Sequence, residues 1–141
     1  MAETIRLGGL ELRFMQTGDS TGGSLDAFEM TVQPNARVPM PHYHQNWDET
    51  IVATAGAMTW RVDGQEFLLQ PGQSAFIRRG VVHDFRNTSP EPATCLCILT
   101  PGVLGPGYFR ELAALLAGGA PDPAKLKDIM LRHGLVPVPQ A

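Results

Sequence analysis

Three of the four histidines and one glutamate are the residues best suited to chemistry in this chain. His42 and His44 are separated by one residue, Glu49 follows shortly after them, and His83 lies further along the chain. Three imidazoles and a carboxylate suit a divalent iron, manganese, nickel, cobalt or zinc ion. Because the group contains no thiolate, it differs from a closed structural zinc site, and a six-coordinate ion would keep two open positions for water, oxygen or substrate. The sequence therefore predicts one metal site at these four residues.

The spacing of the four residues indicates that strands carry them. Side chains alternate between the two faces of a strand, so His42 and His44 point to the same side. Residues 45–48 form a bend, after which Glu49 opens the next β run, and His83 opens another. Ligands that arrive from neighbouring strands could therefore meet inside a barrel.

The first hundred residues have the pattern of a β domain. Apolar residues recur with a period of two, as in Leu10, Leu12 and Phe14 and then in Phe28, Met30 and Val32. Turn signals separate the short runs, and Asp63-Gly64 is the strongest hairpin signal, joining 58–62 to 67–69. The pattern predicts an all-β fold over residues 1–104, an antiparallel sandwich or barrel.

After residue 104 the periodicity becomes helical. Residues 106–117 predict an amphipathic helix that ends at Gly118-Gly119. A second helix begins with Asp122 as its N-cap and Pro123 in the first turn, and stops at Gly134. Residues 105–134 are therefore expected to form a C-terminal helical hairpin, packed on the barrel or on a partner subunit.

Composition limits the classes of protein to which the chain could belong. Its 141 residues fit a single domain spanning 1–141, and 11 basic against 14 acidic residues give a net charge of −3 without a basic run. Neither nucleic acid nor a membrane is expected as a partner. The N-terminus has no signal-peptide pattern and no apolar stretch has membrane-spanning length, which predicts a cytoplasmic protein. Cys95 and Cys97 are expected to be buried small hydrophobic residues.

Two spaced motifs within residues 36–87 resemble those of the cupin superfamily. The first motif is G-x5-H-x-H-x4-E-x6-G. It is matched by His42, His44, Glu49 and Gly56, whereas Ala36 stands where the motif has its first glycine. The second motif is G-x5-P-x-G-x2-H-x3-N. It is matched by Gly72, Gly80, His83 and Asn87, whereas Arg78 stands where the motif has proline. Both departures affect turn geometry or the barrel rim, so every position that binds metal in the family is filled.

The resemblance implies a fold, a metal and an assembly. The fold would be an antiparallel double-stranded β-helix, the jelly-roll barrel of small single-domain cupins, with the helical hairpin as a variation. The metal would be one divalent transition metal ion held by His42, His44, Glu49 and His83. The family also implies a homodimer and a small-molecule substrate.

The leading functional hypothesis is a metal-dependent oxygenase, because the chain resembles quercetinase-like and other small cupin dioxygenases. The alternatives are a redox-neutral isomerase, lyase or decarboxylase and a non-catalytic cupin that binds a metal and a ligand. Redox-neutral chemistry requires a separate general acid or base, for which Glu29 and Asp48 are candidates by position only. No catalytic residue can be assigned from the sequence.

Several further residues are expected to contribute to the site or to its surroundings. Candidates for an apolar pocket, equally well explained as barrel core, are Met40, Met58, Trp60, Phe76 and Phe85. Rim or structural roles are favoured for Tyr43, Trp47 and Asp48, and surface positions for Arg61, Arg78 and Arg79. Asn87 is expected to order a turn or strand end, and His133 to interact with a helix C-terminus.

Overall fold

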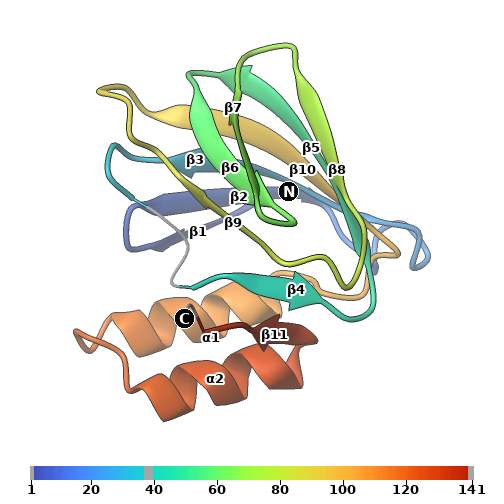
Figure 1. Cartoon of the computed structure of the whole chain (residues 1–141). Coiled ribbons are helices and arrows are strands. Elements are labelled where there is room, and N and C mark those ends of the chain that lie inside the picture. The colour runs from blue at the N-terminus through green and yellow to red at the C-terminus, as the bar shows by residue number, and fades with distance from the viewer. Residues whose placement is uncertain (1, 37–39, 140–141) are drawn as a thin grey trace.

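Two antiparallel sheets face each other, and two helices lie across one end of them (Figure 1). The computed structural model describes residues 2–36 and 40–139. The six-stranded sheet has the order β1-β2-β3-β10-β5-β8, with its members at Glu3–Leu7, Leu10–Gln16, Asp26–Val32, Ala93–Thr100, Asp48–Ala55 and Ser74–Ile77. The five-stranded sheet has the order β11-β4-β9-β6-β7, with its members at Leu135–Pro137, His42–His44, His83–Arg86, Met58–Val62 and Gln65–Leu69. The predicted all-β, antiparallel class is confirmed.

The period-two pattern defines the core between the sheets. The alternating apolar side chains of β2 and β3 are all buried: Leu10, Leu12, Phe14, Phe28, Met30 and Val32. The Asp63-Gly64 hairpin between β6 and β7 forms as predicted, with positive φ at both residues (53° and 80°). This is the combination that a two-residue type I′ turn requires.

The C-terminal helices α1 (Gly107–Leu116) and α2 (Pro123–Arg132) also form where the sequence predicts them. The Asp122 side chain accepts a hydrogen bond from the backbone N–H of Ala124 at 2.9 Å, so the predicted N-cap of α2 is present. The first helix packs against β1 of the same chain, and the second packs against β11. Within the described part of the chain, neither helix has the length and apolarity needed to cross a membrane.

Strand β11 is a feature that the sequence pattern did not predict. It follows α2 directly and pairs with β4 in the register Leu135↔His44, Val136↔Tyr43 and Pro137↔His42. Figure 1 shows β11 beside β4, at the end of the sheets where the two helices lie. A segment from the end of the chain therefore lies beside the strand that carries two of the predicted ligands.

Asp26 joins the barrel to the start of the helical hairpin. Its carboxylate is fully buried and accepts hydrogen bonds from the backbone N–H groups of Gly18 (2.9 Å), Leu104 (3.2 Å) and Gly105 (3.1 Å). These bonds connect the β2–β3 loop to the segment that leads into α1. A buried carboxylate that satisfies three amide donors stabilises both segments.

Replacing Asp26 by alanine should lower the free energy of unfolding by about 3 kcal/mol, because it leaves buried amide donors without a partner. Urea denaturation followed by circular dichroism measures this loss. Glu29→Ala is the matched control, since Glu29 lies on the same strand but is only half-buried and bonds to Arg13 on the outer face. Equal stabilities for the two variants would contradict the role given to Asp26.

Candidate metal centre

The three predicted histidines converge between the two sheets. His42 and His44 lie on β4, and His83 opens β9, where it pairs directly across from His42. The ring centroids lie 4.6–5.1 Å apart, and the three residues offer ligand nitrogens within 4.8 Å of one another. Each side chain is at most 6% exposed. The described residues thus contain a buried three-histidine cluster that could hold a metal ion.

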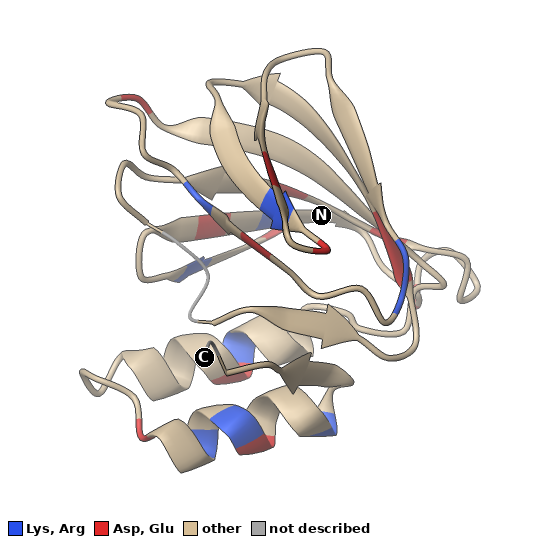
Figure 2. Cartoon of the chain, viewed as in Figure 1, with Lys and Arg blue, Asp and Glu red and all other residues tan. Residues whose placement is uncertain are grey.

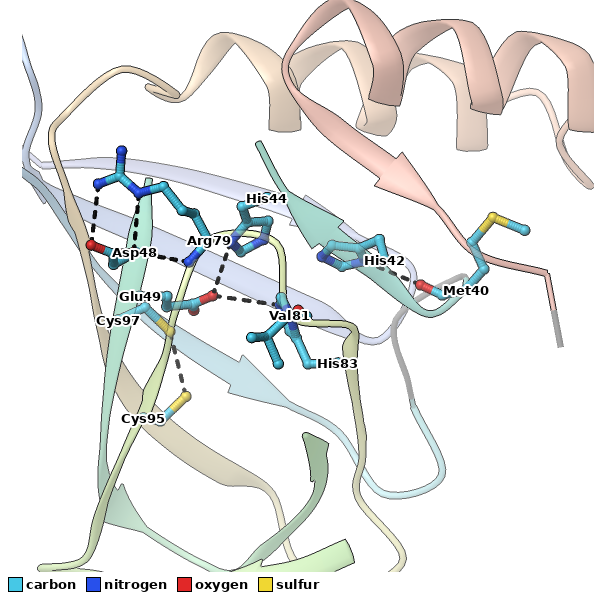
Figure 3. A network of polar contacts seen from close by, with 10 residues as sticks. All are labelled: Met40, His42, His44, Asp48, Glu49, Arg79, Val81, His83, Cys95 and Cys97. Atoms are coloured by element: carbon cyan, nitrogen blue, oxygen red, sulfur yellow. Dashed lines mark hydrogen bonds and ion pairs between the residues drawn. The ribbon is translucent and has the colours of Figure 1, made fainter. Parts of the chain in front are cut away.

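Glu49 approaches this cluster from the opposite sheet, at the second residue of β5 (Figure 3). Its Oε1 atom lies 3.8 Å from Nδ1 of His44 and 3.8 Å from Nε2 of His83. These separations exceed hydrogen-bond length. They lie within the roughly 4 Å that one ion spans with two bonds of about 2.1 Å each. The donor set and its spacing therefore fit a transition metal ion.

Two of the histidines are oriented by backbone carbonyls. Nδ1 of His42 lies 3.1 Å from the carbonyl oxygen of Met40, and Nδ1 of His83 lies 2.9 Å from that of Val81. A carbonyl oxygen only accepts, so each Nδ1 carries the proton and donates it. Each Nε2 is then left with a free lone pair for a ligand bond.

Burial sets the protonation of the cluster. It lowers the pKa of His42 to about 3, with repulsion from His83 acting in the same direction. Burial also lowers the pKa of His44 and of His83. For Glu49 it disfavours the carboxylate and raises the pKa to about 7. At neutral pH the imidazoles are uncharged, which is the form of histidine that binds metals.

The two cysteines lie behind Glu49 on β10, where both are buried as predicted (Figure 3). Their sulfur atoms are 3.7 Å apart. The Cys97 thiol hydrogen-bonds to the Glu49 carboxyl, and this bond partly offsets the rise that burial causes in the pKa of Glu49. The hydrogen bond with Cys95, together with burial, holds the pKa of Cys97 well above its usual range. The Cys97 thiol is therefore neutral at physiological pH.

A small apolar cavity of about 70 Å³ adjoins the cluster. Its walls include the four predicted ligands together with Trp47, Trp60 and Phe85, and apolar side chains of the barrel. Helix α1 closes it with Tyr108, Phe109 and Leu112. A larger hollow of about 650 Å³ lies between the β2–β3 loop and the start of α1, but no histidine lines it. The small cavity is therefore the space in which chemistry at the cluster would take place.

Neither carboxylate proposed as a general acid or base reaches this cavity, so both of those predictions are wrong. Glu29 projects outward from β3 and bonds to Arg13, because its inward neighbours on the strand form the core. Asp48 immediately precedes Glu49 and therefore points away from it, accepting hydrogen bonds from the backbone and guanidinium of Arg79. The Arg79 guanidinium holds the pKa of Asp48 below its usual range.

The predicted pocket residues are only partly correct. Trp60 and Phe85 line the cavity, whereas Met58 is buried in the core away from it. Phe76 is 58% exposed, because it lies on the outer face of the edge strand β8. Met40 contributes its backbone carbonyl rather than its side chain.

Polar residues around the site take structural roles, as expected. Asn87 is fully buried, donates to the carbonyl oxygens of Val32 and Glu91, and accepts from Ser89. Arg61 is paired with Asp84, one of several ion pairs on the outer surface. Figure 2 shows acidic and basic residues interspersed over the sheets and helices.

Sequence reasoning missed the contribution of the helical hairpin to the site. Tyr108 and Leu112 lie on the apolar face predicted for α1, but that face alone does not reveal which surface it covers. Trp47, assigned a rim or structural role, is 1% exposed and stacks on His44 with ring centroids 4.6 Å apart. The sequence feature that could have indicated this contact is the position of Trp47 in the bend between His44 and Glu49.

Two curated proteins resemble part of the chain. An uncharacterised protein of Aquifex aeolicus is 38% identical over 71 residues, which are 50% of this chain and 58% of that protein. Quercetin 2,3-dioxygenase of Bacillus subtilis is 37% identical over 71 residues, 50% of this chain and 20% of the dioxygenase. The matches thus span less than two thirds of either relative.

The fold and the family are shown by two further comparisons. A predicted oxalate decarboxylase from Thermotoga maritima superimposes with a TM-score of 0.65 at 18% identity, covering 72% of this chain and 92% of that one. The cupin domain family matches residues 28–99, which is slightly more than half of the sequence and includes all four predicted ligands. The chain belongs to the cupin family.

Proposed function

We propose that His42, His44, Glu49 and His83 hold one divalent transition metal ion, and that the protein is a metal-dependent dioxygenase acting on a small organic molecule. The observation that carries the proposal is the convergence of three buried, neutral imidazoles and a carboxyl group beside an apolar cavity. The similarity of half of the chain to quercetin 2,3-dioxygenase supports the reaction type.

The chain's own residues would hold and isolate the ion. The carbonyl oxygens of residues 40 and 81 fix two imidazoles with Nε2 free, and the opposite sheet supplies the carboxylate. Apolar side chains exclude water, which strengthens electrostatic interactions inside the cavity. A bound ion of this kind supplies redox chemistry and open coordination positions for an oxygenation.

The ionisable groups of the cavity favour oxygenation over redox-neutral chemistry. Among the described residues that line it, Tyr108 is the only ionisable group besides the four proposed ligands. Burial raises the pKa of Tyr108 well above its usual range, so its phenol stays protonated and cannot act as a base near neutral pH. An isomerase or lyase would need such a base.

The size and lining of the cavity favour a small substrate that bears oxygen. A cavity of about 150 Å³ holds benzene, and this one measures about 70 Å³. Trp47 and Trp60 line it, and each has a buried indole N–H without a partner among the described residues. A carbonyl or enolate oxygen of the substrate would satisfy such a donor.

Oxygen consumption by defined metal forms tests the proposal. The purified protein is stripped of metal, loaded anaerobically with Fe²⁺, Mn²⁺ or Ni²⁺, and mixed with small enols, catechols and flavonols. We expect metal-dependent uptake with small enols and little with catechols or flavonols, which are larger than benzene and too large for the cavity. Metal found after purification is not a guide to the native ion, because copper, nickel and zinc outcompete iron and manganese at such sites.

Intact metal binding without oxygen uptake by any form would contradict the oxygenase and leave the redox-neutral and non-catalytic alternatives. The homodimer implied by the family resemblance stays a prediction, which sedimentation analysis of the purified protein would test.

A further inference from the structure

The third histidine of the cluster is held differently from the other two. Among the described residues, His44 has no backbone carbonyl bonded to its ring, whereas His42 and His83 each have one. Instead the Trp47 ring stacks on it, with an interplanar angle of 23°. The orientation of His44 therefore depends on what holds Trp47.

The chain segment that follows α2 also packs closely against Trp47. Gly134 has φ of +86°, and a Cβ atom there would lie only 3.1 Å from Cζ3 of Trp47 and 3.0 Å from Nδ2 of Asn46. The carbonyl oxygen of Gly134 accepts a hydrogen bond from the backbone N–H of Gln45 at 2.9 Å. The indole thus lies close to Gly134 and also stacks on the imidazole of His44.

Strand β11 continues this contact along the strand that carries the ligands. It pairs with β4 at all three positions, whereas the pairing of β4 with β9 has the single register position His42↔His83. Beyond β11, the backbone N–H of Val138 donates to the carbonyl oxygen of Pro41 at 2.9 Å. Much of the backbone support of β4 therefore comes from residues 134–138.

We infer that Gly134 and Trp47 are positioning residues for His44, and that segment 134–138 is a structural part of the metal centre. This inference rests on the proposed function, because it assigns a role toward the proposed ion. Neither residue has to touch the ion. They restrict the imidazole to one orientation, and outer contacts of this kind typically contribute 10- to 100-fold to metal affinity.

A matched pair of glycine variants tests the inference. Gly134→Ala and Gly119→Ala both place alanine at a positive φ in the C-terminal part of the chain, at +86° and +104°. Only the Cβ at 134 meets Trp47 and Asn46, since nothing lies within 4 Å of a Cβ at 119. Calorimetric titration of the metal-stripped proteins with Co²⁺ should show affinity at least about tenfold lower for Gly134→Ala. For Gly119→Ala it should stay within about twofold of the wild type.

Two variants of Trp47 keep the test decisive if Gly134→Ala does not fold. Trp47→Leu removes the aromatic stack, whereas Trp47→Phe keeps a ring against His44. We expect Trp47→Leu to lower Co²⁺ affinity about tenfold or more and Trp47→Phe to restore most of it. Far-UV circular dichroism of each metal-free variant separates weaker binding from loss of fold.

Wild-type Co²⁺ affinity in both Gly134→Ala and Trp47→Leu, or in Trp47→Leu alone if the glycine variant is unfolded, would overturn the positioning role. Failure of Trp47→Phe to restore binding above that of Trp47→Leu would also count against it. In either case loss of binding in His83→Ala would leave the metal site itself standing. Retention of full affinity by His83→Ala would instead refute the proposed function.

Discussion

Replacing His83 or Glu49 by alanine is expected to lower the affinity of the metal-stripped protein for Co²⁺ by at least about 100-fold, more than is typical for contacts outside the ligands. Each change removes one of four converging donors from a site that a single ion would span. Isothermal titration calorimetry at pH 7.5 measures the loss directly.

The chain offers a matched control for each replacement. His133 is the fourth histidine, and its Nε2 lies 2.5 Å from a carboxylate oxygen of Glu111 on the helical hairpin. Glu29 lies outside the barrel, bonded to Arg13. His133→Ala and Glu29→Ala should bind Co²⁺ within about threefold of the wild type. Equal affinities in all four variants would rule out the proposed ligand set.

Acidification from pH 7.5 to 5.5 should strongly destabilise the metal-free protein. The pKa of each ligand histidine is lowered in the fold, so its contribution to stability is lost as the pH falls below about 6.5, where the unfolded chain takes up protons. Glu49 acts in the opposite direction, because its pKa rises from 4.5 to about 7 and its contribution is greatest at low pH.

Three histidines outweigh one carboxyl group in this balance. Near pH 5.5 the unfolded chain binds almost two protons at His42 and His44, which stay neutral in the fold, while the folded chain binds about one at Glu49. A net difference of about one proton corresponds to a fall of roughly 1 kcal/mol in unfolding free energy per pH unit, and the lowered pKa of His83 adds to this fall. Urea denaturation at pH 7.5, 6.5 and 5.5 measures it.

A variant that lacks one of the histidines provides the control for the pH prediction. His42→Leu should reduce the slope of stability against pH by about one proton equivalent, because leucine does not titrate. A stability that does not change between pH 7.5 and 5.5 in the wild type would show that the histidines are not buried and neutral as described.

The sequence contained most of the information about the three histidines. The two-residue spacing of His42 and His44 required a strand to bring them to one face, and β4 provides it. His83 joins them because its strand, β9, lies beside β4. By contrast, Glu49 arrives from the opposite sheet, which local alternation cannot predict. Its inclusion depended on the expectation that strands meet inside a barrel, and the family resemblance implied the same residue.

The errors have equally specific causes. Phe76 is a large apolar residue on the outer face of an edge strand, where alternation gives the inner face to Ala75 and Ile77. Strand β11 has only three residues, too few to display a periodicity. The role of α1 in closing the cavity depends on packing between distant segments, so an amphipathic pattern showed that one face is buried but not against what.

The pairing of β11 with β4 also affects the order in which the site can form during synthesis. The paired residues are more than ninety positions apart in the sequence. A growing chain can bring β9 to β4 well before β11 has been made. The strand that carries His42 and His44 therefore gains its second neighbour only once residue 137 has left the ribosome, so full ordering of the ligands is a late event of folding.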